Sequence, residues 1–372
     1  MLSSRRPINH RFIRNLLLLT IFLSQQCFAL NFKLERVVEV LGIPWGISFL
    51  SEQHLIVSER AGRLILVDLR QGEIQALSGL PKIAIVGQGG LLDVARGPNY
   101  LSDGWIYFTY SKARDNGAVT TLARARLNQT RLIDWQDLLV TDSATDTGRH
   151  FGSRIAFDDD GHVYFGIGDR GVRKNSQNMS NHAGSIIRLS LDGRVPADNP
   201  FVGQKNRRYE IWSYGHRNPQ GLLFDNNNKT LWSIEHGPRG GDEINLIKKG
   251  RNYGWPVISY GKEYWGPVSV GEGTEKAGME QALKIYIPSI APGSLILYNG
   301  DAFPEWKNSL FAGALKLQHL NRIPILSDNV LGEEERFLED LGERIRALAQ
   351  SPEGWIYFST DSGIIYRLRP QQ

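Results

Sequence analysis

A turn followed by a short strand of β-branched and aromatic residues occurs six times along this sequence. The copies lie at 51–57, 103–108, 160–165, 229–233, 308–312 and 353–358. A second strand follows several of them after another turn, as at 62–67, 184–189 and 363–368. Short strands that repeat in this way, without sustained helical periodicity, are typical of radially arranged antiparallel sheets. The sequence therefore predicts an all-β fold, a six-bladed β-propeller with four-stranded antiparallel blades.

The mean repeat of about 57 residues exceeds the roughly 40 to 50 that a four-stranded blade needs, so loops must take up the difference. The excess is concentrated between Gly166 and Gly313, where we expect the functional face. The segment 31–41 is expected to pair beside 364–369 and complete the last blade. Closing the ring in this way removes an exposed sheet edge.

Residues 1–29 have the pattern of a cleaved signal peptide. Arginines at 5, 6, 11 and 14 precede an apolar run at 16–23 and a small-x-small triplet at 27–29. The run is much shorter than the roughly 20 apolar residues of a membrane span. We therefore expect an exported, periplasmic protein with no membrane span, in which residues 30–372 form a single catalytic propeller domain.

Removal of this leader also changes the charge and the cysteine content. The whole sequence has 43 Lys and Arg against 39 Asp and Glu; the leader holds four arginines and no acid, so the mature chain has 39 of each. A neutral chain gives no electrostatic support for a nucleic-acid partner. The single cysteine, Cys27, leaves with the leader. Disulfides, thiolate metal sites and covalent haem are then excluded, so redox chemistry would need a non-covalently held cofactor.

Several loops are richer in Gly, His, Arg, Asn and Asp than strand turns require. They lie at 87–92, 149–154, 168–171, 214–221 and 235–245. Strand-end loops of different blades converge at the mouth of a propeller channel, so these residues can face one ligand.

His150 is the candidate general base in these loops. We place it at the start of a strand that ends in the turn at 160–161, and Asp169 at the end of the paired strand, where its carboxylate can orient the imidazole. Two simpler interpretations stay open. His150 can be a histidine satisfied by hydrogen bonds, and Asp169 a turn carboxylate that accepts backbone N–H groups.

Four basic residues lie at or near predicted strand ends, namely Arg217, Lys316, Arg344 and Arg346. Arg344 and Arg346 flank one residue, so both point to one face if that segment is a strand. Two guanidinium groups on one side suit carboxylates, although a solvated strand face is the alternative.

The Gly237-Pro238 pair leaves carbonyls that can point outward, as a calcium ion prefers. The acidic pair Asp242-Glu243 could add carboxylates, and both pairs are also ordinary loop features. The sequence has no EF-hand run and no zinc-type His/Glu spacing.

Eight segments together resemble one family. They are 44–46, 88–92, 150–154, 168–169, 214–221, 237–245, 252–256 and 342–346. In this order they resemble the soluble quinoprotein glucose/sorbosone dehydrogenases, and most of all the bacterial aldose sugar dehydrogenases, over 34–368. The resemblance implies a six-bladed propeller that oxidises a small-molecule aldose at the anomeric carbon to a lactone, by hydride transfer to calcium-bound pyrroloquinoline quinone.

The resemblance also implies roles for individual residues. His150 resembles the general base, Asp169 its neighbouring carboxylate, and Arg217 the group that stabilises negative charge on the quinone oxygen. Positions that match cofactor contacts are Gln88, Asn218, Lys316, Arg344, Arg346 and, more weakly, Tyr264. The carbonyls of Gly237 and Pro238 would help bind calcium. Glu243 and the carbonyl of Tyr253 resemble a further, structural calcium site.

The substrate and partners are less determined. Arg149 precedes the base where glucose-oxidising members carry an aspartate, which leaves the preferred sugar open. Electrons would leave through a separate acceptor, and a monomer and a homodimer are both compatible with the sequence. Two other functions remain alternatives, a calcium-dependent propeller lactonase and a non-enzymatic propeller that binds a partner, because fold alone cannot separate them.

Overall fold

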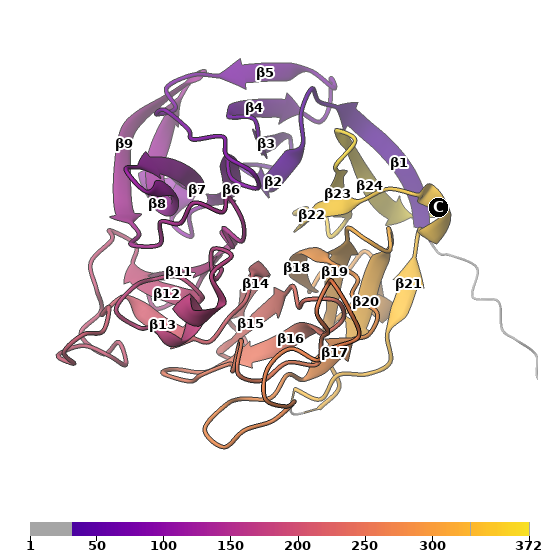
Figure 1. The fold of residues 1–372 in the computed structure, drawn as a ribbon. Helices are drawn as coiled ribbons and strands as arrows, with labels where there is room; N and C mark the ends of the chain where they lie inside the picture. Colours follow the sequence, from indigo (N-terminus) through magenta and orange to yellow (C-terminus); the bar gives the residue numbers. More distant parts are fainter. Residues whose placement is uncertain (1–31, 328, 372) are drawn as a thin grey trace, which may run out of the picture. The chain divides into compact units, whose positions relative to one another are not determined.

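Six four-stranded sheets surround a central channel in a computed structural model of the chain, which describes residues 32–327 and 329–371 (Figure 1). Every strand pair within a sheet is antiparallel. The all-β six-bladed propeller predicted from the repeats is therefore confirmed. The predicted signal peptide, at 1–29, lies outside the described residues.

The first three blades follow one another along the chain, each running from the channel outward. Their strands are β2 (Pro44–Phe49), β3 (His54–Glu59), β4 (Arg63–Asp68) and β5 (Ile74–Leu77) in blade 1; β6 (Leu91–Arg96), β7 (Trp105–Arg114), β8 (Gly117–Asn128) and β9 (Arg131–Val140) in blade 2; and β10 (Ile155–Phe157), β11 (His162–Ile167), β12 (Ser185–Ser190) and β13 (Ile211–Tyr214) in blade 3.

The last three blades repeat the pattern, except that blade 6 takes its outer strand from the beginning of the chain. Their strands are β14 (Pro219–Asp225), β15 (Thr230–Glu235), β16 (Asp242–Ile247) and β17 (Lys284–Tyr286) in blade 4; β18 (Pro292–Tyr298), β19 (Ser309–Ala314), β20 (Leu320–Pro324) and β21 (Glu335–Phe337) in blade 5; and β22 (Ile345–Gln350), β23 (Ile356–Thr360), β24 (Ile364–Pro370) and β1 (Phe32–Glu39) in blade 6.

Each predicted turn-strand unit is the second strand of a blade, counted from the channel, namely β3, β7, β11, β15, β19 and β23. Ring closure also occurs as expected. β1 pairs with β24 from Phe32↔Pro370 to Glu39↔Ile364, with one irregularity between Arg36 and Val38. The first and last described strands thus complete the same blade.

The core lies mainly between blades. Six clusters of buried apolar side chains each combine residues of two adjacent blades, as where Ile56 of β3 and Phe108 of β7 share one cluster. Alternate residues of a strand point to opposite sheet faces, so each blade packs against both neighbours. This packing fixes the loop ends of neighbouring blades relative to one another.

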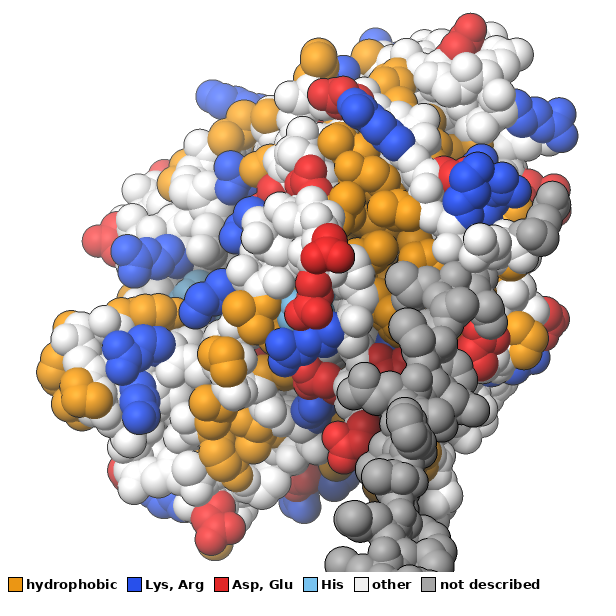
Figure 2. Space-filling model, turned by 90° about the vertical axis from the view of Figure 1, so that its right-hand side faces the viewer, with side chains coloured by type: hydrophobic (Ala, Val, Ile, Leu, Met, Phe, Trp, Pro, Cys, Tyr) orange, Lys and Arg blue, Asp and Glu red, His pale blue; other side chains and the backbone are white. Residues whose placement is uncertain are grey.

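The outer surface carries both signs of charge. On the described part of the face in Figure 2, basic and acidic side chains are interspersed. None of the helices in 32–327 and 329–371 has the length and apolar character needed to cross a membrane.

Candidate active site

Loops of several blades meet at one end of the channel. A cavity of ≈ 260 Å³ there is lined by residues that include Trp45, Gln88, Asn218, Arg344 and Arg346, from blades 1 and 6 and from the loops before β6 and β14. The convergence expected from the sequence is therefore observed. The opposite part of the channel forms a larger cavity of ≈ 630 Å³, lined by the innermost strands.

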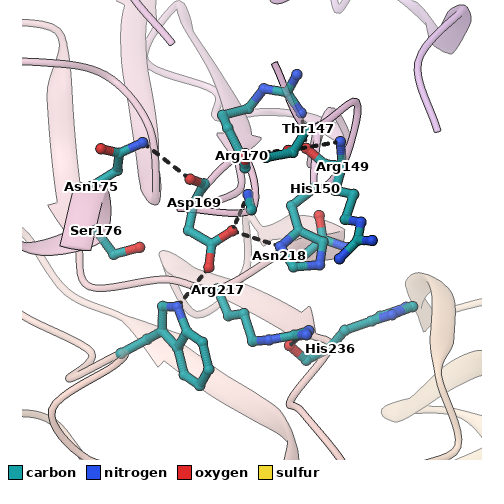
Figure 3. A network of polar contacts seen from close by, with 12 residues as sticks. Thr147, Arg149, His150, Asp169, Arg170, Asn175, Ser176, Arg217, Asn218 and His236 are labelled. Carbon is teal, nitrogen blue, oxygen red and sulfur yellow. Dashed lines mark hydrogen bonds and ion pairs between the residues drawn. The ribbon is translucent and has the colours of Figure 1, made fainter. Parts of the chain in front are cut away.

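His150 and Asp169 are hydrogen-bonded to each other (Figure 3), beside the cavity of ≈ 260 Å³. His150 Nδ1 lies 2.6 Å from Asp169 Oδ1, and the next two residues, Phe151 and Gly152, line the cavity. Because the carboxylate can only accept, Nδ1 carries the proton and Nε2 is left as an acceptor. This orientation is the one that a general base requires.

The position of His150 differs in one respect from the prediction. It does not begin a strand but lies in the loop five residues before β10, with a left-handed backbone (φ 53°). Its N–H donates to Gln88 Oε1 at 2.8 Å, and the buried Arg170 guanidinium donates to the carbonyl of Arg149. Strand periodicity cannot reveal such a loop, because contacts from other blades hold the conformation.

Burial and charge set the protonation of this pair. Burial lowers the pKa of His150 below its ordinary 6.5, and the positive charges of Arg217 and Arg170 act in the same direction against the attraction of Asp169. Burial alone would raise the pKa of Asp169, but the hydrogen bonds from His150 and Gly171 and the charge of Arg217 lower it. Near neutral pH the pair is therefore a neutral imidazole beside an ionised carboxylate.

Arg217 is the buried cation next to this pair. Its NH1 donates to the carbonyl of His236 at 3.0 Å, and its own carbonyl accepts the N–H of Asp169 at 2.8 Å. Its Nε is buried and has no hydrogen-bond partner within the described part of the chain. An unpaired buried donor is costly, so this atom is a candidate contact for a group bound in the adjoining cavity beside Gly237 and Pro238, which Arg217 lines.

Arg344 and Arg346 lie on the same side of their segment, as expected, and both line the cavity. They share a carboxylate partner that the sequence did not reveal. Arg344 precedes β22, and both arginines bond the carboxylate of Asp361, at 2.8 Å from each Nε. Lys316 lies on the loop after β19, exposed, beside the cavity residue Leu315. Of the four predicted basic residues, Arg344 and Arg346 line this cavity, and Asp361 compensates part of their charge.

A second, smaller cavity next to the first is lined by the candidate calcium residues Gly237, Pro238, Glu243 and Tyr253, together with Glu235. Asp242 is not free for a metal, because it accepts from Gly237 N, Ser289 Oγ and Ala291 N within 2.9 Å. The described residues contain no group of three or more His, Cys, Asp or Glu side chains suited to a metal. A cation here would depend on carbonyl oxygens as well as carboxylates.

The carboxylate of Glu243 favours such a cation, whereas the oxygens of Glu235 already accept from His216 Nδ1, Arg217 N and Asn218 N. The amide nitrogen of Asn245 lies 3.3 Å from an oxygen of each glutamate, while Asn245 Oδ1 is buried without a partner among the residues described. Burial, with the adjacent Glu235 charge, raises the pKa of Glu243 to about 8. A buried carboxylate such as that of Glu243, with no cationic partner of its own along the described segments, fits a hard ion such as calcium.

Glu243→Gln is expected to stabilise the calcium-free protein in alkaline buffer. Unfolding returns Glu243 to its ordinary pKa of 4.5, so its raised pKa costs folding free energy above pH 4.5 and most above about pH 8. We expect the melting temperature at pH 9 to rise by about 2 °C or more, as roughly 1 kcal/mol gives in a chain of this size, with no change below pH 4.5. Added calcium should stabilise the wild type more than the variant. The exposed Glu353→Gln is the control, and an equal response of both variants would contradict the assignment.

Tyr264 is the one candidate that the structure leaves apart from the others. Its side chain is 66% exposed on the long loop between β16 and β17. The preceding Glu263 holds Arg173 through two bonds of 2.6 and 2.7 Å, and Arg173 lies over the Trp255 ring, 5.5 Å from its centre. Tyr264 therefore borders the site without lining either cavity.

Arg154 is a central residue to which sequence reasoning gave no role. It bonds Asp93 at 2.8 Å and the carbonyls of Gly293 and Arg346 at 2.8 and 3.1 Å, and its guanidinium stacks over Trp45, 4.1 Å from the ring centre. Arg154 lines the cavity of ≈ 630 Å³, whereas Trp45 and Arg346 line the cavity of ≈ 260 Å³. It therefore forms the floor between them, and only its place in the segment 149–154 could have indicated it.

The sequence of this chain is similar to those of known proteins. The family model described as glucose/sorbosone dehydrogenase matches residues 41–367. The aldose sugar dehydrogenase YliI of Escherichia coli is 37% identical over 344 residues, which cover 91% of this chain and 92% of that protein.

Solved structures give the same picture. The apo-form of the soluble aldose sugar dehydrogenase of E. coli has a TM-score of 0.88 and 35% identity, covering 91% of this chain and all of that chain. The PQQ-bound aldose sugar dehydrogenase of Streptomyces coelicolor has a TM-score of 0.76 and 26% identity, covering 91% and 98%. In both cases the similarity extends over nearly the whole propeller.

Proposed function

Because this chain belongs to the glucose/sorbosone dehydrogenase family, we propose that it is an aldose sugar dehydrogenase that uses pyrroloquinoline quinone and calcium to oxidise the anomeric carbon to a lactone. The observation that carries the proposal is the His150–Asp169 pair, joined at 2.6 Å beside a cavity that Arg344 and Arg346 line. A base next to a cationic cavity suits proton removal from a sugar hydroxyl near an anionic cofactor.

The cavity residues fit the quinone by charge. Its three carboxylates need lasting positive charge, which Arg344 and Arg346 supply from the cavity wall and Lys316 from the loop beside it. The unpaired Nε of Arg217, in the adjoining cavity, offers a further donor. The side chains of Gln88 and Asn218 line the same cavity. Calcium would be held by the carbonyls of Gly237 and Pro238, and a structural ion by Glu243 and Tyr253. When bound, the calcium-held quinone supplies the carbonyl carbon that accepts hydride.

The protein side chains divide the remaining work. His150 Nε2 takes the proton of the anomeric hydroxyl, and Asp169 stabilises the imidazolium that results, since its carboxylate faces Nδ1. Arg217 stabilises negative charge that develops next to it, because its buried guanidinium lines the adjoining cavity, which shares His236 with the first. Gln88 links the base to the cavity, because its Oε1 accepts from the backbone N–H of His150 and Gln88 also lines the cavity.

The test is reconstitution of the purified protein. We expect the mature chain, recovered from the periplasmic fraction with Leu30 as its first residue, to bind quinone in the presence of calcium. Aldoses should then reduce an artificial electron-accepting dye, and removal of calcium by a chelator should abolish this activity. Bound quinone with no dye reduction by any aldose would disprove the function, and hydrolysis of a lactone without quinone would favour the lactonase alternative. Recovery with residues 1–29 still attached would contradict export.

A further inference from the structure

A tryptophan lies on the far side of the carboxylate that faces the base. Trp255 Nε1 donates to Asp169 Oδ2 at 2.8 Å. Asp169 Oδ1 accepts from His150 Nδ1 (Figure 3) and, at 2.7 Å, from Gly171 N. Asp169 is 1% and Trp255 6% exposed, so water does not replace these donors freely. Each carboxylate oxygen is thus held by the protein.

The backbone and ring of Trp255 are themselves fixed. Its N–H donates to the carbonyl of Gly215 at 2.9 Å, and its carbonyl accepts from Gln177 Nε2 at 2.8 Å. The guanidinium groups of Arg217 and Arg173 lie 5.3 and 5.5 Å from the ring centre. The indole therefore reaches Asp169 from a rigid position in the long β16–β17 loop.

From this geometry we propose that Trp255 is a positioning residue for the general base: its indole N–H fixes the Asp169 carboxylate that orients His150. This role rests on the proposed function, since it acts on the base of that reaction. The charged and titratable groups around the pair are Arg217, Arg170, Arg173 and His236. Trp255 differs from them because it supplies a neutral donor to the oxygen that faces away from the imidazole.

The physical effect has a definite sign. A hydrogen bond to an ionised carboxylate lowers the basicity of that carboxylate. Without the indole N–H, Asp169 holds positive charge on His150 more strongly, so the pKa of His150 rises. Asp169 is then held through Oδ1 alone, by His150 and Gly171, so the carboxylate is less firmly fixed and the imidazole less well aligned for proton transfer.

Trp255→Phe tests this role, since it keeps an aromatic ring beside the arginines and removes the donor; the loss of ring volume is matched in the control variant. In ring-labelled histidine NMR of the apo-protein, we expect the His150 pKa to rise by about half a unit or more. In the reconstituted enzyme, the acid limb of the kcat/KM profile should move to higher pH and kcat should fall roughly tenfold, with KM changed less than twofold. The control is Trp212→Phe, because Trp212 Nε1 has no partner in the described chain.

Two further measurements decide between positioning and general structural damage. In an Asp169→Asn background, Trp255→Phe should no longer move the His150 pKa. In the wild-type protein, which carries no folding risk, the indole resonance of Trp255 should shift over the same pH range as the His150 ring resonances. An indole resonance that does not follow His150, or an unmoved pKa in a folded Trp255→Phe variant, would overturn the proposal. These readouts need no turnover, so they stand apart from a failure of dehydrogenase activity.

Discussion

Replacing His150 by asparagine is expected to lower kcat for aldose oxidation at least 100-fold while the protein still binds quinone. A positioned base contributes typically a factor of 100 to 10,000, and an amide cannot accept the proton. Asparagine is chosen because it tolerates the left-handed backbone of His150 (φ 53°), and its amide can still donate to Asp169. The measurement is steady-state dye reduction, with quinone binding followed by absorbance titration.

The matched control is His54→Asn, because His54 lies in β3 and hydrogen-bonds Ser51 outside the candidate site. It should retain wild-type turnover. Unchanged kcat in the His150 variant would remove the residue from the reaction. Loss of quinone binding with normal turnover per bound quinone would make it a cofactor ligand instead of a base.

Arg154→Met is expected to cause the largest loss of stability of any substitution considered. Its side chain and that of Asp93 are only 8% and 9% exposed, so the change leaves a carboxylate buried without its cation. Breaking a buried pair in this way typically costs about 3–5 kcal/mol. Three carbonyl acceptors of other blades, those of Gln220, Gly293 and Arg346, also lose their donor. Urea unfolding monitored by tryptophan fluorescence measures the change.

Two comparisons make this result specific. Arg194→Met removes an exposed pair with Asp192, in which the arginine is 82% exposed, and should change stability little. The double variant Asp93→Asn, Arg154→Met should lose less than the sum of the two single changes, because neither charge is left alone. Additive losses, or a loss below about 1 kcal/mol for Arg154→Met, would show that the pair is not the central link inferred here.

The blades could be predicted from sequence because their determinants are local. A turn such as that at 160–161, followed by β-branched and aromatic residues, specifies a strand without reference to the rest of the chain. Closure by the first strand could also be predicted, because an unpaired edge beside β24 would be exposed.

Much of the candidate site could not be predicted in this way. The hydrogen bond that fixes the carboxylate beside the base joins Asp169 and Trp255, which lie 86 positions apart. The ion pair below the cavity joins Asp93 and Arg154, which lie 61 positions apart. No local pattern records such a pair. Loop composition and strand-end position singled out His150, Arg344 and Arg346 and family resemblance gave them roles, but Asp361, which joins the two arginines, became visible only in three dimensions.

The pairing of β1 with β24 has a consequence for how the propeller is made. Phe32 and Pro370 are partners in one ladder, so the strand synthesised first must wait for the strand synthesised last. Closing so long a loop is slow, and until then blade 6 presents an open edge. A nascent or truncated chain that lacks β24 therefore cannot complete blade 6. The closed propeller, in which blade 6 lies next to blade 1, requires synthesis of the whole chain.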